Sequence, residues 1–319
     1  MLGKNSSGKR GNDPVQNMPA ALTDIGCERE INEDRYAVVD SHLGRVWVVC
    51  DGMGGCLGGE LAAQLAIDAI RRKLESTDAQ IPETGLVSAV EEANRIILLR
   101  RQNPAFSSMG TTVVTALLYN NEEVLLSHAG DSRAYLIREG NIQQLTTDHT
   151  YVQDLVERGV IKPHEALSHP QAHVLTRCLG AEANLNLDLQ KYWVWPVEEG
   201  KEDKLLLCSD GLYSLVDDDE IAEICTTYQS QESCIRLTEL AKSHGGYDNI
   251  TVAIIPIPGE LREEKPTQKV AKAKTVRKPT YSVARRRLSP EKRIGLIIFM
   301  IALGILIGLP LALLKIMSV

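Results

Sequence analysis

The spacing of apolar residues predicts a folded region between about residues 20 and 257. Alternating or continuous apolar runs predict three strands within 111–137 and further strands at 35–40, 46–51, 185–194, 204–209 and 249–257. Apolar residues at i, i+3 and i+4 predict helices at 58–74, 87–101, 150–161, 218–226 and 231–243. Strands follow one another and helices come in pairs, so the pattern predicts an α+β fold built on antiparallel sheets.

A separate apolar run extends from Ile294 to Leu314, and its 21 residues include no charged side chain. At about 1.5 Å per residue, a helix of this length reaches about 31 Å, close to the hydrocarbon thickness of a bilayer. Core helices are usually shorter, so we expect a transmembrane helix rather than a buried one. The predicted organisation is then a disordered N-terminus (1–19), a globular domain (20–257), a basic linker (258–293), the transmembrane helix (294–314) and a short tail (315–319).

Charges on either side of this run predict its orientation. Arg285, Arg286, Arg287, Lys292 and Arg293 precede it, and only Lys315 follows. Because positive charge stays on the cytoplasmic side, we expect a single-pass protein of the inner, cytoplasmic membrane with its globular domain in the cytoplasm. The seven cysteines form no CxxC pair, and the N-terminus has no apolar signal segment, which both favour a reducing compartment.

The charge is unevenly distributed. The formal net charge is −7, but the linker has twelve Lys and Arg against four Asp and Glu, which leaves −15 for the rest of the chain. So acidic a domain argues against nucleic-acid binding, which depends on clustered Lys and Arg. It suits a site in which carboxylates gather around cations.

Acidic residues stand beside turn formers at the ends of predicted strands, in the pairs Glu33-Asp34, Asp51-Gly52, Gly130-Asp131, Asp210-Gly211 and Asp248-Asn249. A single pair of this kind usually only makes a turn. Five pairs indicate more, because carboxylates brought together at one end of a sheet repel one another unless cations neutralise them. Aspartate and carbonyl oxygens suit magnesium or manganese better than zinc.

Seven segments stand in a fixed order: GCEREINEDRY (26–36), VVCDGMGG (48–55), SSMGTTVV (107–114), HAGDSRAYLI (128–137), LTTDH (145–149), LLCSDGL (206–212) and YDNITV (247–252). Through them, residues 20–257 resemble the metal-dependent serine/threonine protein phosphatases of type 2C, and bacterial members in particular. The resemblance implies a four-layer α-β-β-α sandwich of two antiparallel sheets flanked by helices. It also implies hydrolysis of phosphoserine and phosphothreonine by water activated between two Mn²⁺ or Mg²⁺ ions, with phosphorylated proteins and an opposing serine/threonine kinase as partners.

The same resemblance assigns the metal ligands. Asp51 matches the aspartate that bridges both ions, and the carbonyl of Gly52 completes the second site. Asp210 and Asp248 match the remaining protein ligands of the first ion. Two ions about 3.5–4 Å apart would lower the pKa of a water between them and hold the phosphoryl oxygens for in-line attack.

Four further residues are assigned to the surroundings of the two ions. Glu33 and Asp34 match an element that acts largely through metal-bound water, and Asp131 matches an aspartate that holds a weaker third ion together with Asp210. Arg29 matches the arginine that grips the substrate phosphate, for which a forked and permanently charged donor is well suited. Residues 148–179 fall where bacterial members have a mobile flap.

The group that protonates the leaving oxygen is not assigned. Eukaryotic members have a histidine after the Asp-Gly pair, where this chain has Met53. His128, His149 and His169 are candidates only by their place in the sequence, and metal-bound water is the default. Two other functions stay open: a pseudophosphatase that binds phosphoproteins without hydrolysing them, and a regulatory phosphatase dedicated to one partner protein.

Overall fold

The computed structural model describes residues 17–54, 58–198 and 200–263. The chain divides into two compact units, residues 1–265 and 266–319, and all described residues belong to the first unit. The predicted transmembrane segment 294–314, the tail and most of the linker lie outside the described residues. Within the described ranges, no helix combines the length and the apolar character needed to cross a membrane.

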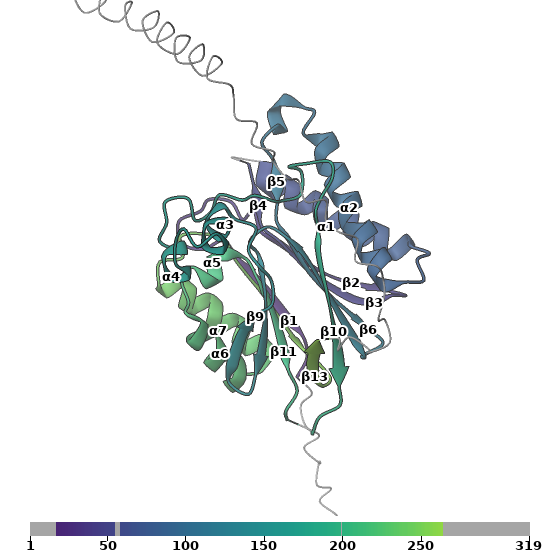
Figure 1. Ribbon diagram of the computed structural model, residues 1–319, viewed down its shortest axis with the longest axis vertical. Coiled ribbons are helices and arrows are strands. Elements are labelled where there is room, and N and C mark those ends of the chain that lie inside the picture. Colours follow the sequence, from purple (N-terminus) through teal and green to yellow (C-terminus); the bar gives the residue numbers. More distant parts are fainter. Residues whose placement is uncertain (1–16, 55–57, 199, 264–319) are drawn as a thin grey trace, which may run out of the picture. The chain divides into compact units, whose positions relative to one another are not determined.

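Two antiparallel sheets form the centre of the first unit (Figure 1). One sheet has the order β1 (Ala20–Asp24), β12 (Ile250–Pro256), β11 (Lys204–Cys208), β8 (Arg133–Arg138) and β9 (Asn141–Gln144). The other has the order β13 (Glu260–Glu263), β10 (Asp188–Trp195), β7 (Glu123–Ala129), β6 (Val113–Tyr119), β3 (Gly44–Cys50) and β2 (Arg35–Ser41). A small ribbon pairs β4 (Gly52–Met53) with β5 (Gly110–Thr111).

Helix pairs cover the outer faces of the sheets (Figure 1). α1 (Gly58–Ser76) and α2 (Pro82–Arg100) pack on the six-stranded sheet, and α6 (Asp218–Thr227) and α7 (Ser230–Ser243) pack on the five-stranded sheet. Short helices lie in the connections: the 3-10 helix η1 (Pro104–Phe106), α3 (Tyr151–Glu157), α4 (Pro163–Ala166) and α5 (Asp210–Tyr213). The arrangement confirms the predicted α-β-β-α layers.

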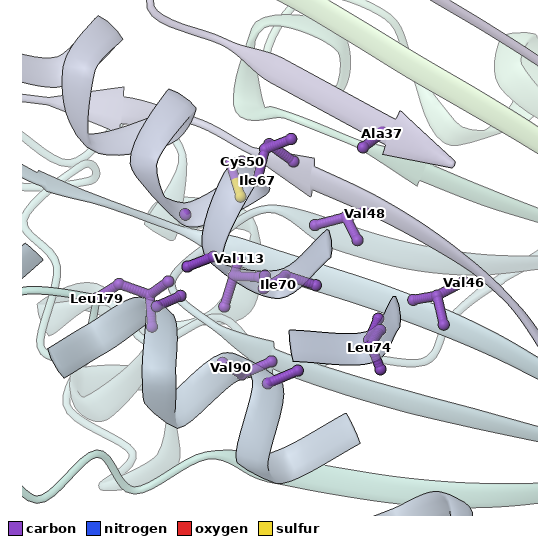
Figure 2. Packing of buried hydrophobic residues seen from close by; sticks show 14 of the residues in the cluster. Ala37, Val46, Val48, Cys50, Ile67, Ile70, Leu74, Val90, Val113 and Leu179 are labelled. Carbon is purple, nitrogen blue, oxygen red and sulfur yellow. The ribbon is translucent and has the colours of Figure 1, made fainter. Parts of the chain in front are cut away.

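Three buried clusters separate these four layers. Strand β3 passes between two of them, and its residues 46–50 are buried and apolar. Figure 2 shows Val46 and Val48 facing Ile70 and Leu74 of α1 in the outer cluster. Trp47, between them in sequence, belongs to the cluster between the two sheets. Successive side chains of a strand point to opposite faces, so a strand covered on both sides has to be apolar at every position.

In the two large sheets, the sequence pattern does not predict strands β1, β9 and β13. Each lies at the edge of a sheet and has only four or five residues, too few for a clear apolar alternation. β13 occupies residues assigned to the basic linker and pairs with β10. Asn17, assigned to the disordered N-terminus, accepts hydrogen bonds from the backbone and hydroxyl of Ser230.

Candidate metal centre

The turns that follow β3 and β7, the first residue of α5 and the turn that precedes β12 bring Asp51, Asp131, Asp210 and Asp248 together. Burial, followed by the charges of Asp34, Asp210, Asp131 and Asp248, raises the pKa of Asp51 well above its usual range. Burial and the charge of Asp210 likewise raise the pKa of Asp131 to about 8. Residues that are as much as 197 positions apart in sequence (51 and 248) therefore share one electrostatic site.

Thr112 ties three of the sequence motifs together. The backbone N–H of Asp51 donates to Thr112 Oγ1 at 2.9 Å, and the backbone N–H of Thr112 donates to the carbonyl of Asp51 at 2.8 Å. Thr112 Oγ1 also lies 2.7 Å from the hydroxyl oxygen of Ser132, the residue after Asp131. The backbones that carry Asp51 and Asp131 are thus fixed relative to each other by one buried threonine.

The Asp34 carboxylate is buried and hydrogen-bonded to the protein itself. Its Oδ2 accepts a hydrogen bond from the hydroxyl of Ser209 at 2.6 Å, and that hydroxyl oxygen accepts one from the backbone N–H of Thr251 at 3.0 Å. Burial raises the pKa of Asp34 to about 7, although hydrogen bonds from the side chains of Ser209 and Thr251 act against the shift. Through Ser209, Asp34 holds the start of the segment that presents Asp210.

Glu33 and Gly52 meet at the start of α1. Backbone N–H groups of Gly59 and Glu60 bond to the Glu33 carboxylate and act to lower its pKa, but burial is the larger influence and raises it. Gly52 is buried, and a side chain there would collide with the carbonyl oxygens of Gly59 and Glu33. Only glycine lets the Asp51-Gly52 turn approach the helix so closely.

Asn249 holds the loop that carries Arg29. Its side-chain nitrogen donates to the carbonyls of Ile25 at 2.9 Å and Ile31 at 3.1 Å, and its side-chain oxygen accepts from the backbone N–H of Glu33 at 2.7 Å. Arg29 itself donates to Asp248 Oδ2 at 2.6 Å. The residue assigned to substrate phosphate therefore lies against one of the assigned metal ligands.

The three candidate histidines lie elsewhere. The rings of His128 and His149 stack with their centroids 4.5 Å apart, and His149 contacts Asp188 and Arg177. His169 accepts a hydrogen bond from the backbone N–H of Gln171 in a local turn.

His173 contacts the centre instead, with Nδ1 3.1 Å from Asp210 Oδ2. The hydrogen bond to Asp210 is the main cause that raises the pKa of His173. The sequence analysis missed this residue, although its position within 148–179, opposite the assigned ligands, was a signal.

The residues present fit hard divalent cations. Asp210 Oδ1 is buried and has no hydrogen-bond partner among the described residues. An unpaired carboxylate oxygen is costly to bury, so it needs a ligand that the protein itself does not supply. The carboxylates of Asp51, Asp131 and Asp248 lie around it and supply the oxygen ligands that magnesium and manganese prefer, with His173 Nδ1 beside them.

Comparison with known proteins identifies the family of this chain. The family profile described as Protein phosphatase 2C matches residues 28–242. The chain belongs to the protein phosphatase 2C family. This confirms the resemblance that the seven motifs carry.

Some relatives match this chain over most of their own length. Serine/threonine phosphatase stp of Listeria monocytogenes serotype 4b is 35% identical over 241 residues, which are 73% of this chain and 93% of stp. The crystal structure of PstP/Ppp from Mycobacterium tuberculosis aligns with a TM-score of 0.66 and 37% identity over 74% of this chain and 96% of that chain. A catalytic domain of PstP in complex with two manganese ions aligns with a TM-score of 0.65 and 34% identity, over 75% and 97% of the two chains.

Proposed function

We propose that this protein phosphatase hydrolyses phosphoserine and phosphothreonine in proteins with two manganese or magnesium ions, held by Asp51, the Gly52 carbonyl, Asp210 and Asp248. The observation that carries the proposal is the buried, unpartnered Oδ1 of Asp210 inside a cluster of mutually repelling carboxylates. The two manganese ions of the related PstP domain support the choice of metal. When bound, such ions neutralise the carboxylates and the phosphate ester and supply an activated water.

The chain's own residues would position the substrate and the ligands. Arg29 is half-exposed at the edge of the cluster and is placed to leave Asp248 and bind phosphate oxygens through its two-nitrogen fork. Asp34 fixes the Asp210 segment through Ser209. Glu33 would act through water at the second ion, and Asp131 adds a carboxylate beside Asp210 for a weaker third ion.

The test is phosphate release by the purified full chain from phosphoserine and phosphothreonine peptides and from a small aryl phosphate. We expect hydrolysis with Mn²⁺ or Mg²⁺ and none in excess chelator. Peptide binding without hydrolysis under any metal would make the chain a pseudophosphatase, which the complete set of assigned ligands argues against. Activity on one phosphoprotein but on no peptide would favour a phosphatase dedicated to one partner.

We also propose that residues 294–314 anchor the enzyme in the inner membrane with its catalytic domain in the cytoplasm. The support is the uninterrupted apolar run and the excess of cations before it. An anchored phosphatase would act on phosphoproteins close to the membrane, opposite a serine/threonine kinase.

A further inference from the structure

Strand β2 forms an open edge of the six-stranded sheet. It has seven residues and lies beside β3 at one end of the strand order (Figure 1). Natural proteins protect sheet edges by keeping edge strands short or by placing charges on them. The edge strands β9 and β13 follow this rule, because each has four residues and a single apolar side chain. β2 does not follow it, since Tyr36 and Val38 are 38% and 44% exposed.

The hydrogen bonds of β3 determine which backbone groups of β2 face outward. The N–H of Thr112 donates to the carbonyl of Asp51 at 2.8 Å, which makes these two residues a hydrogen-bonded pair just beyond the β3–β6 ladder. Bonding direction alternates along an antiparallel strand, so odd-numbered residues of β3 bond to β6 and even-numbered ones to β2. The register pairs even-numbered residues of β3 with odd-numbered residues of β2. The N–H and C=O groups of Tyr36, Val38 and Asp40 therefore point to the open edge.

These outward groups are available for pairing. Among the residues that the structure describes, none outside β3 forms a backbone hydrogen bond with Tyr36, Val38 or Asp40. An exposed edge of this kind adds a further strand through main-chain hydrogen bonds.

The open edge begins beside the metal centre. β2 follows directly from Asp34, and its first register partner, Cys50, directly precedes Asp51. At about 3.3 Å per residue, Tyr36 lies about 7 Å along the chain from Asp34. The loop that carries Arg29 joins β1 to this same end of β2. A substrate whose phosphate is held by Arg29 therefore has β2 within reach of the residues next to its phosphorylated side chain.

We propose that β2 binds an extended segment of the phosphoprotein substrate, next to the phosphorylated residue, as an additional strand of the sheet. The inference rests on the proposed function because it concerns the same substrate. The edge is continuous with the substrate site, which favours a substrate segment over a second copy of this chain. Main-chain bonds to Tyr36, Val38 and Asp40 supply the affinity. The preferred segments are therefore unfolded, free of proline and rich in β-branched or aromatic residues.

The first test uses the purified full chain with Mn²⁺ and phosphothreonine peptides of one sequence, in which a run of alternating Val and Thr flanks the phosphothreonine. Two further versions are N-methylated at alternate residues of the run, one in each register, which removes N–H donors and keeps the side chains. In an added strand only one register faces β2. Methylation in that register should raise KM by about 10–100-fold, the cost of two or three main-chain hydrogen bonds, and methylation in the other should not.

The second test changes the edge itself. Val38→Pro removes an outward N–H and leaves the ladder to β3 intact, so KM for the unmethylated peptide should rise by about 3–10-fold. The rate on a small aryl phosphate, which has no flanking segment, should not change. Val38→Thr keeps the backbone donor and is the matched control, expected to behave as wild type. Val38→Lys places on the edge a charge of the kind that prevents strand pairing, and should also raise KM if the proline variant proves unstable.

Hydrogen exchange measures binding without turnover. A phosphonate analogue of the unmethylated peptide, which the enzyme cannot hydrolyse, should slow exchange at Tyr36, Val38 and Asp40. Exchange in the edge strand β9 should stay the same.

Equal KM values for the two methylation registers, or unchanged exchange at β2, would overturn the proposal. It would also be overturned if the wild type sediments as a dimer and Val38→Pro as a monomer with the same KM, because the edge would then pair with a second copy. Absence of hydrolysis of both peptide and aryl phosphate would contradict the proposed function instead, and the exchange measurement would still report binding at β2.

Discussion

Nη2 of Arg29 and Oδ2 of Asp248 lie 2.6 Å apart, joined by an ion pair between a proposed phosphate ligand and a proposed metal ligand. The two side chains are 47% and 37% exposed. Pairs with this exposure contribute little stability, because water and salt screen them. A divalent cation held by Asp248 would therefore compete with Arg29 at small cost and leave the arginine free to bind the substrate phosphate.

Arg29→Ala should raise KM for phosphopeptides by about 10–100-fold, the loss expected for a hydrogen-bonded charge. The affinity for Mn²⁺ should stay the same or increase, because the competing cation at Asp248 is gone. Steady-state kinetics and calorimetry measure the two effects separately. Arg29→Lys keeps the charge but not the two-nitrogen fork, so its KM should lie between those of the wild type and Arg29→Ala. Loss of metal binding in Arg29→Ala would contradict the phosphate role.

Asp51→Asn and Asp248→Asn should each lower kcat by several orders of magnitude, roughly 10³-fold or more, since losing an ion removes both the nucleophile and the charge stabilisation. Calorimetry should show that each substitution also abolishes the tight binding of Mn²⁺. Asp78→Asn removes an exposed carboxylate far from the motifs and is the control. An Asp51→Asn enzyme with unimpaired turnover is incompatible with the two-metal site.

Stability in excess chelator should fall as pH rises from about 4 to about 8, between the unfolded-state and folded-state pKa values of two buried carboxyl groups. The folded-state pKa values of Asp34 and Asp131, about 7 and about 8, exceed the ordinary value of 3.8. Carboxyl groups of this kind stabilise the fold while protonated, and the contribution is lost as pH rises through the folded-state pKa. The Tm of metal-free protein should decrease across this range, and Mn²⁺ should raise Tm most at the upper end. Asp131→Asn should make the decrease in Tm with pH smaller. A wild-type Tm that stays constant or rises with pH would contradict the role of these carboxyl groups.

Ser209→Ala should lower the free energy of unfolding by roughly 1–3 kcal/mol, because the buried Asp34 carboxyl and the N–H of Thr251 lose their shared partner. Denaturant titration in chelator isolates this effect from metal binding. Ser214→Ala, on the exposed side of the same segment, should be neutral. Equal stability of the two variants would mean that Asp34 is not held through Ser209.

Fractionation tests the proposed anchor. The full chain should pellet with membranes and resist carbonate, and a chain that ends before Ile294 should stay in the supernatant with its activity. Protease added to spheroplasts should leave the catalytic domain intact if it faces the cytoplasm. Recovery of the full chain in the supernatant would disprove the anchor, and digestion of the domain from outside would disprove the orientation.

The layered fold could be predicted from the sequence because it depends on local periodicity. Trp47, Val48 and Val49 are apolar in succession since β3 is covered on both faces. The edge strands β9 and β13 escaped prediction for the opposite reason. Their register is set by pairing with β8 and β10. Each has only four residues and a single apolar side chain, Ile142 in β9 and Leu261 in β13, so neither gives a periodic signal of its own.

The sequence by itself also indicated the chemistry, since five acidic pairs at predicted strand ends would repel one another without cations. Only the tertiary structure decided which other groups reach those carboxylates. Asp34 bonds to Ser209 across 175 positions, Arg29 to Asp248 across 219, and His173 to Asp210 across 37. Such contacts follow from the packing of two sheets and from how segment 148–179 returns on itself. No local pattern encodes them, so His173 could be found only when the folded chain placed it.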